Sequence, residues 1–256
     1  MLTILILVVS AALSAPPPPQ RVPVGPGNWR PVFPPEEGLE EITVPRFLLD
    51  VTPVTNAEFL AFTRENPAWR RGAVSRLLAD DRYLARWEGP DALSADAGPN
   101  QPVTDVSWYA ARAYCAWAGA RLPTVAEWEL AAAASETVAD ATRDPEFLAA
   151  ILVWYGSPSP GVLPDVGGRA ANVWGVHDLH GLVWEWTEDF NSVLVSADDR
   201  DQKGADKVLF CGAGALAAQD KGDYAAFMRV ASRSSMEAWY TTSTTGFRCA
   251  ADVEEP

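Results

Sequence analysis

The chain has 256 residues, of which 48% are hydrophobic, and its formal net charge at pH 7 is −14. This length and apolar content predict one sizeable domain with a substantial core. The negative charge argues against nucleic acids and anionic membranes as partners, because both repel an acidic surface.

The first 15 residues, MLTILILVVSAALSA, form an apolar run that ends in small residues, which predicts a signal peptide over 1–15. The run is too short for a comfortable membrane span. We therefore expect a protein that is exported, to the periplasm or beyond, with no membrane anchor once the signal is removed. Residues 16–40 are rich in Pro, Gly and Glu, which predicts an extended leader that is poorly ordered or draped over a domain formed by residues 41–256.

A strand is expected over residues 44–51, followed by a helix. Thr55 and Glu58 have the spacing of a capping box, which marks the start of that helix. The charged stretch 68–101 predicts irregular structure, with room for a short helix over 73–87.

Residues 102–129 predict two helices joined by a tight turn. Ser107 can cap the first helix, which should end at Gly119. Thr124 and Glu127 form a second capping box in front of the next helix. Because aromatic residues recur at helical spacing in this stretch, both helices should bury one face.

The remaining elements are predicted from shorter patterns. A further helix is expected over residues 144–154, and a Pro/Gly loop over 156–171. In the last third, short apolar segments between Gly and Ser predict strands at residues 207–211, 224–232 and 245–250.

Three segments carry a family resemblance. PVTDVSW…AYCAWAGARLPTVAEWE, NVWGVHDLHGLVWEWTEDF and RVASRSS…TGFRCAAD resemble, in this order, the motifs of the formylglycine-generating enzyme (sulfatase-modifying factor) family. The resemblance covers about residues 47–252. It implies an irregular α+β domain related to C-type lectins, with few short strands and helices.

The resemblance also bears on the three cysteines. It implies a disulfide between Cys115 and Cys249, which would close a loop of about 130 residues and contribute roughly 4–5 kcal/mol on the chain-entropy model. The family's second structural pair is missing, with alanines over 131–134 and Val230 at the matching positions. Cys211 is then left without an obvious partner.

The segment DLHGLVWEWTED resembles the family's calcium loop, and calcium prefers carboxylate and carbonyl oxygens. Leu182 replaces the asparagine that the family usually has. The alternative is a structural turn in which Glu185 caps backbone N–H groups. The matching ligands are Asp178, Gly181 and Val183 (both through backbone carbonyls), and Glu185.

Formylglycine-generating enzymes oxidise a substrate cysteine with O₂, using Cu(I) held by two cysteines about five residues apart. The corresponding segment here, CGAGALAAQD over 211–220, contains neither cysteine of that pair, and Gly214 replaces the serine of the family's GGS motif. Without these thiolates the family's oxidase mechanism cannot run. Trp184, in contrast, is retained at a position that lines the family's active site.

A replacement copper site is one reading of the remaining ligands. His177 and His180 are the two histidines of the chain, and with Cys211 they would suit copper, with Met228 or Met236 as a weak further ligand. The other readings of the cysteine are a buried small hydrophobe, an intermolecular disulfide or a thiol that faces a ligand.

The other residues of interest lie in the C-terminal third. Arg229, Arg233 and Arg248 sit in apolar segments, where arginines more often pair with buried carboxylates than act in catalysis. Aromatic side chains there are expected in the core or along a groove that could bind a protein segment or a small molecule. Oligomeric state is left open.

These observations predict an exported family member that lacks the cysteine-pair oxidase centre and acts as a binding or maturation-accessory protein. AYCAWAG, HGLVWEW and FCGAGA are most similar to accessory proteins found alongside copper nitrite reductases. The alternative is a copper-dependent oxidase of the formylglycine-generating type that uses Cys211 as its thiol ligand. A third reading is a purely structural protein stabilised by calcium.

Overall fold

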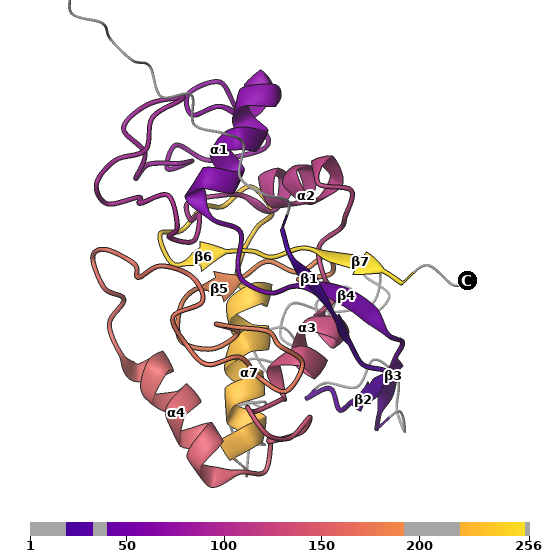
Figure 1. Ribbon diagram of the computed structural model, residues 1–256. Coiled ribbons are helices and arrows are strands. Elements are labelled where there is room, and N and C mark those ends of the chain that lie inside the picture. Colours follow the sequence, from indigo (N-terminus) through magenta and orange to yellow (C-terminus); the bar gives the residue numbers. More distant parts are fainter. Residues whose placement is uncertain (1–18, 33–39, 192–220, 254–256) are drawn as a thin grey trace, which may run out of the picture.

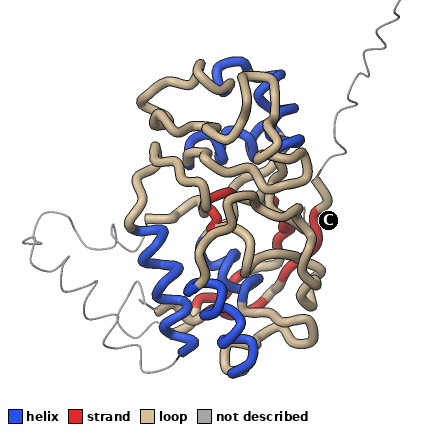
Figure 2. The backbone as a smooth tube through the Cα atoms, turned by 90° about the vertical axis from the view of Figure 1, so that its left-hand side faces the viewer, coloured by secondary structure: helices blue, strands red, loops and turns tan. Residues whose placement is uncertain are grey.

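The computed structural model describes residues 19–32, 40–191 and 221–253. Helices α1 and α2 lie at one end of the molecule and α4 and α7 at the other, with the short strands between them (Figure 1). Loops and turns make up most of the described backbone (Figure 2). No helix within the described ranges is long and apolar enough to cross a membrane. The strands are β1 (Arg21–Val24), β2 (Gly27–Trp29), β3 (Ile42–Val44), β4 (Phe47–Asp50), β5 (Trp184–Glu185), β6 (Thr245–Gly246) and β7 (Ala250–Asp252), and the helices are α1 (Asn56–Glu65), the 3₁₀ helix η1 (Pro67–Trp69), α2 (Trp108–Trp117), α3 (Val125–Ala132), α4 (Pro145–Gly156) and α7 (Lys221–Ser234).

The strands form three small sheets. β4 lies between β1 and β7 and is antiparallel to both, with Leu49 opposite Val22 on one side and Ala250 on the other. β2 pairs with β3 in a hairpin, and β5 pairs with β6 in parallel. The first sheet therefore joins the N-terminal part of the domain to its C-terminal end.

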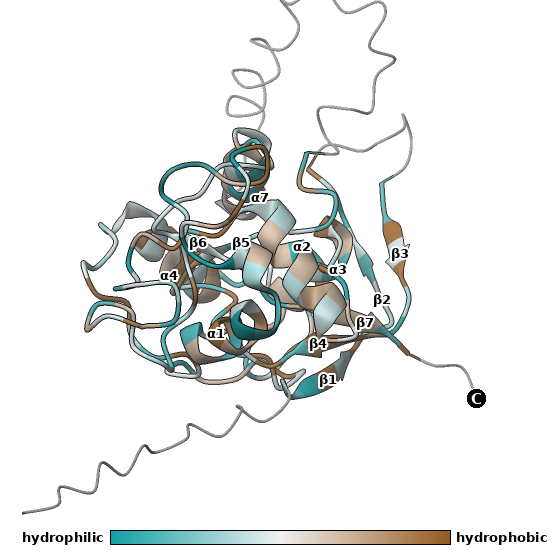
Figure 3. Ribbon diagram, turned by 90° about the horizontal axis from the view of Figure 1, so that it is seen from above, coloured by the Kyte–Doolittle hydropathy of each residue, from teal (hydrophilic) through white to brown (hydrophobic). Residues whose placement is uncertain are grey.

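The segment expected to be a leader contains two of these strands. β1 and β2 lie within residues 16–40 and pair with β4 and β3. Helix α3 lies beside β2 and β3 (Figure 3). The approach is close enough that a Cβ on Gly27 would lie 2.7 Å from a methyl carbon of Leu130, so any side chain at this position would require Leu130 to move.

The predicted helix starts are confirmed. Capping boxes are present at Thr55 with Glu58 and at Thr124 with Glu127, and the Ser107 hydroxyl accepts from the backbone of α2. The helix expected over 144–154 is α4, whose N-cap is Asp144. These local signals were sufficient because each cap satisfies N–H groups within a few residues of itself.

Two predicted elements are wrong, and one lies outside the described residues. Residues 73–87 form successive turns instead of a helix. The strand expected over 224–232 is part of helix α7, in which Ala225, Arg229 and Arg233 recur at a spacing of four and are all buried. The strand expected over 207–211 falls outside the described ranges.

Two large clusters and a small one, of Leu163, Leu182 and Val183, form the core of the described residues. The first gathers aromatic residues of α1 and α2, including Phe59 and Phe62, around Tyr114 and Phe247. The second packs α3 against the three-stranded sheet. The disulfide between Cys115 and Cys249, implied by the resemblance, is present, and both residues are fully buried in the first cluster.

Replacing both Cys115 and Cys249 by alanine is expected to lower the free energy of unfolding by about 2–5 kcal/mol, because the unfolded chain regains freedom across the long loop that the disulfide closes. Urea unfolding of both proteins measures the difference. A reductant should destabilise the wild type and leave the variant unchanged; equal stability of the two oxidised proteins would contradict the prediction.

Candidate functional site

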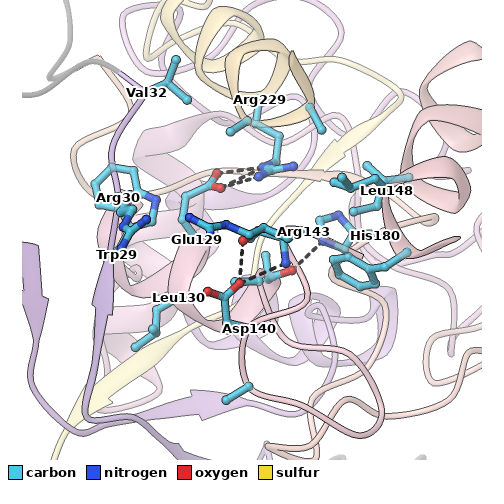
Figure 4. A pocket seen from close by; sticks show the side chains of 18 of the residues that line it. Trp29, Arg30, Val32, Glu129, Leu130, Asp140, Arg143, Leu148, His180 and Arg229 are labelled. Atoms are coloured by element: carbon cyan, nitrogen blue, oxygen red, sulfur yellow. Dashed lines mark hydrogen bonds and ion pairs between the residues drawn. The ribbon is translucent and has the colours of Figure 1, made fainter. Parts of the chain in front are cut away.

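A cavity of about 550 Å³ lies between the β2–β3 hairpin, α3, α4 and α7 (Figure 4). We call it the α3–α4–α7 pocket. Its apolar wall comes mainly from Leu130, Phe147, Leu148 and Ile151. Its polar lining includes Arg30, Glu129, Asp140, Arg143, His180 and Arg229.

A buried ion cluster reaches the floor of this pocket through two residues that line it, Glu129 and Arg229. Glu129 accepts from Arg229, with N–O distances of 2.6–3.0 Å, and from Arg233 at 2.9 Å. Arg229 also donates to the hydroxyl of Tyr155 at 3.0 Å. Burial alone would raise the pKa of Glu129, but the two guanidiniums outweigh it and lower the pKa to about 2. The predicted pairing of these arginines with a buried carboxylate is confirmed.

His180 lies at the edge of the same pocket, where its ring meets Trp128 and Phe147 edge-on. Its Nε2 lies 2.8 Å from the carbonyl oxygen of Ala132, an acceptor, so Nε2 carries the proton. Burial, followed by the charge of Arg229, lowers the pKa of His180 to about 4. The ring is therefore neutral at pH 7, and its Nδ1 is a buried acceptor without a partner among the described residues.

The predicted copper ligands are only partly described. The Nδ1 of His177 lies 2.6 Å from the carbonyl oxygen of Arg169, so the two histidines engage different partners. Met236 packs against the first core cluster, and Cys211 lies outside the described residues. Within the described ranges no group of three or more His, Cys, Asp and Glu side chains could hold a metal ion. The copper site stays a prediction.

Glu185 forms a fully buried ion pair. Both its oxygens accept from Arg248 at 2.8 Å, and one also accepts from the indole of Trp128 at 2.7 Å. The side chains of Glu185 and Arg248 are both 0% exposed. The carboxylate is thus neutralised by a guanidinium, and the expected structural pairing of Arg248 is confirmed.

The other predicted calcium ligands lie in a loop that an arginine already contacts. Asp178 accepts from the backbone N–H groups of Gly167 and Arg169. A Cβ on Gly181 would lie 2.3 Å from the Arg169 guanidinium carbon. Glu185 is paired as well, so two of the four predicted ligands engage protein groups. Calcium binding by Asp178, Gly181, Val183 and Glu185 stays a prediction.

Trp184 is covered by helix α4. Its ring stacks on Tyr155 with centroids 5.0 Å apart and lies 5.3 Å from Trp154. The hydroxyl of Tyr155 continues to Arg229. The residue expected to line an active site therefore packs against α4 and is not among the residues that line the α3–α4–α7 pocket.

Arg143 and Asp140 line the pocket but were not predicted from the sequence. Both precede Asp144, and the only local signal in that stretch is the cap of α4. The pocket is assembled from five chain segments, and no spacing pattern links them.

Comparisons with known proteins agree on the family. A family model described as Sulfatase-modifying factor enzyme 1-like domain matches residues 13–253. The chain is 30% identical over 263 residues to the inactive C-alpha-formylglycine-generating enzyme 2 of Bos taurus, with 86% of this chain and 82% of that protein covered. It is 29% identical over 225 residues to the serine/threonine-protein kinase pkn1 of Chlamydia caviae, with 86% of this chain covered. It spans 35% of that kinase's length.

A solved structure shares the fold. The crystal structure of CarF aligns with a TM-score of 0.51 at 17% sequence identity, covering 93% of this chain and 99% of that one. At this identity the likeness concerns the fold alone. The expected irregular α+β architecture, with few short strands and helices, is confirmed.

Glu185→Gln is expected to lower the free energy of unfolding by about 3–5 kcal/mol, because it leaves Arg248 buried and uncompensated. The control is Asp81→Asn, since Asp81 pairs with Arg76 at the surface and such pairs contribute about 0–1 kcal/mol. Urea unfolding measures both. Equal losses in the two variants would show that the buried pair is not the stronger constraint.

His180 predicts a pH dependence of stability. Between pH 6.5 and 4 the unfolded chain binds a proton at His180 that the folded protein does not, so the free energy of unfolding should fall by about 3 kcal/mol as the pH drops. His180→Phe should remove this fall, and His177→Phe should keep it. Urea unfolding at several pH values measures the slopes.

Burial raises the pKa of Asp50 to about 6 against the opposing charge of Arg21, so Asp50 contributes with the opposite sign. Asp50 is the same in all three proteins, and the difference between variants therefore isolates His180. Parallel slopes in the wild type and His180→Phe would contradict the prediction.

Proposed function

This chain belongs to the family of sulfatase-modifying factor enzyme 1-like domains, and we propose that it acts as an exported binding or maturation-accessory protein without oxidase chemistry. One observation carries the proposal. The chain has three cysteines, and two of them, Cys115 and Cys249, are joined in a buried disulfide. Cys211 is left, so a single chain cannot supply the two thiolates with which the family's enzymes hold Cu(I).

The surroundings of Trp184 support this reading. Its ring is stacked against Tyr155 of α4, which covers a residue whose position lines the active site in the family's enzymes. A relative of similar length is named an inactive formylglycine-generating enzyme, so loss of the activity within this family has a parallel.

The α3–α4–α7 pocket supports a binding role. Its volume of about 550 Å³ lies in the range of roughly 300–1,000 Å³ found for ligand sites. It combines an apolar wall with a few polar groups that point to one space, which is the usual composition of such sites (Figure 4). A protein segment or a small molecule could occupy it.

We assign the partner to the copper enzymes of denitrification on the motifs AYCAWAG, HGLVWEW and FCGAGA. The apolar run over 1–15 supports export, which would bring the protein into the compartment of such an enzyme. In that setting the protein would assist maturation by holding its partner or a ligand.

The alternative is a copper-dependent oxidase in which His177, His180 and Cys211 replace the cysteine pair. It requires a redox metal and turnover with O₂. The described partners of the two histidines, the carbonyl oxygens of Arg169 and Ala132, favour the binding role.

The proposal predicts no tight one-to-one Cu(I) complex when the mature protein is titrated anaerobically against a competing chelator. It also predicts no O₂ uptake with a cysteine-containing peptide. Cys211→Ser should behave as the wild type in both measurements. Stoichiometric copper binding and O₂ uptake that disappear in Cys211→Ser, with an unchanged melting temperature, would overturn the proposal in favour of the oxidase.

A further inference from the structure

Two buried arginines lie at the floor of the α3–α4–α7 pocket, and one of them, Arg229, lines the pocket directly. Two guanidiniums, of Arg229 and Arg233, share the carboxylate of Glu129, and no second carboxylate bonds either one within the described ranges. Both arginines are nearly buried, with 8% and 7% of their surface exposed. A buried cation without its own counter-ion is costly, and it is unusual in a chain of net charge −14. The pocket lining as a whole holds three guanidiniums, of Arg30, Arg143 and Arg229, and three carboxylates, of Glu41, Glu129 and Asp140, so an anion needs a guanidinium that is not already bonded.

A further cation lines the pocket nearer to solvent. Arg143 is exposed, and its guanidinium makes no hydrogen bond or ion pair with any described residue. The neighbouring carboxylate of Asp140 accepts from Thr142, and the charge of Arg143 acts on that carboxylate without a direct hydrogen bond or ion pair. Arg30, on the opposite side, is already paired with Glu41 at 2.6 Å. Arg143 is therefore the cation with donors left for a ligand.

His180 adds a directional requirement. Its Nε2–H is used by the carbonyl of Ala132, so the buried Nδ1 can only accept. A buried acceptor left unpaired costs free energy, and a ligand with an N–H or O–H group would remove that cost. Beside it, Leu130, Phe147 and Ile151 offer an apolar surface to the body of the ligand.

We propose that the α3–α4–α7 pocket binds a carboxylate that has an apolar side chain and a neighbouring N–H or O–H donor. The carboxylate lies between Arg143 and the Arg229 side of the floor, and the donor faces Nδ1 of His180. This chemistry occurs in N-acylated or hydroxylated small acids and at the C-terminal residue of a peptide. The inference rests on the proposed binding role and names its ligand class.

The test uses N-acetyl-L-phenylalanine and its uncharged amide, N-acetyl-L-phenylalaninamide, as calorimetric probes of the full-length mature protein. The acid should bind at least tenfold more tightly than the amide, because only the acid offers a carboxylate to the guanidinium of Arg143. Arg143→Gln should weaken binding of the acid about tenfold and leave the amide unchanged. The control is Arg76→Gln, a surface arginine with 84% of its side chain exposed, which should change neither.

The donor is tested with 3-phenylpropanoate, which keeps the ring and the carboxylate but lacks the N–H. The wild type should prefer N-acetyl-L-phenylalanine over it by several fold. His180→Phe keeps an aromatic ring but removes the acceptor, so this preference should disappear. His177→Phe should retain the preference, and a general loss of structure would not change one ratio alone.

Two acetylated pentapeptides that end in phenylalanine, one with a free and one with an amidated C-terminus, distinguish the two ligand sources. Much tighter binding of the free peptide than of the acetylated amino acid indicates a protein C-terminus, and equal binding indicates a small acid. Equal affinity for acid and amide, or no binding of any acid at millimolar concentration, would overturn the inference. Neither result touches the proposed absence of oxidase activity, which the copper and O₂ measurements test separately.

Discussion

The buried pair of Glu185 and Arg248 holds together β5, the loop that leads into it and the end of β4, which do not belong to one sheet. Besides the carboxylate, the guanidinium donates to the carbonyl oxygens of Asp50, Val51 and His177. Arg248, which precedes the disulfide cysteine Cys249, therefore links the end of β4 to the loop that leads into β5. In a fold whose strands have two to four residues, such a saturated polar network fixes positions that sheets fix elsewhere.

The same network positions the pocket. Trp128 donates to Glu185, and the next residue of α3, Glu129, holds Arg229 and Arg233 of α7. Neighbouring helical residues point in different directions, so α3 is tied to the β5 strand on one side and to α7 on the other. By the resemblance, the family's second disulfide would lie near residues 131–134, but this chain has alanines there. Here the ion cluster provides a link between α3 and α7.

The elements predicted correctly from the sequence are those whose ends are fixed by contacts between residues close together in the chain. Helix starts at Thr55 and Thr124 follow from caps that act within one turn, whereas β5 and β6 are two residues long and carry no period. The segment 224–232 was predicted as a strand from its short apolar run between Gly and Ser. In α7 the arginines, which usually mark an exposed face, are buried on Glu129 and form part of the helix's inner face. His180 was predicted as a metal ligand from its spacing to His177. Only the tertiary structure shows that its ring packs against Trp128 and Phe147 at the edge of the α3–α4–α7 pocket.

The residues that remain favour recognition over redox chemistry. A Cu(I) centre needs soft, paired thiolates, and the disulfide removes two of the three sulfurs that could serve. The pocket offers the exposed guanidinium of Arg143, which has no hydrogen bond or ion pair among the described residues, and the neutral imidazole of His180, which can only accept. An uncharged ligand without an N–H or O–H group leaves both of these groups unpaired. Because an unmet buried group costs more than a satisfied one contributes, the pocket discriminates chiefly by penalising ligands without a charge and a donor.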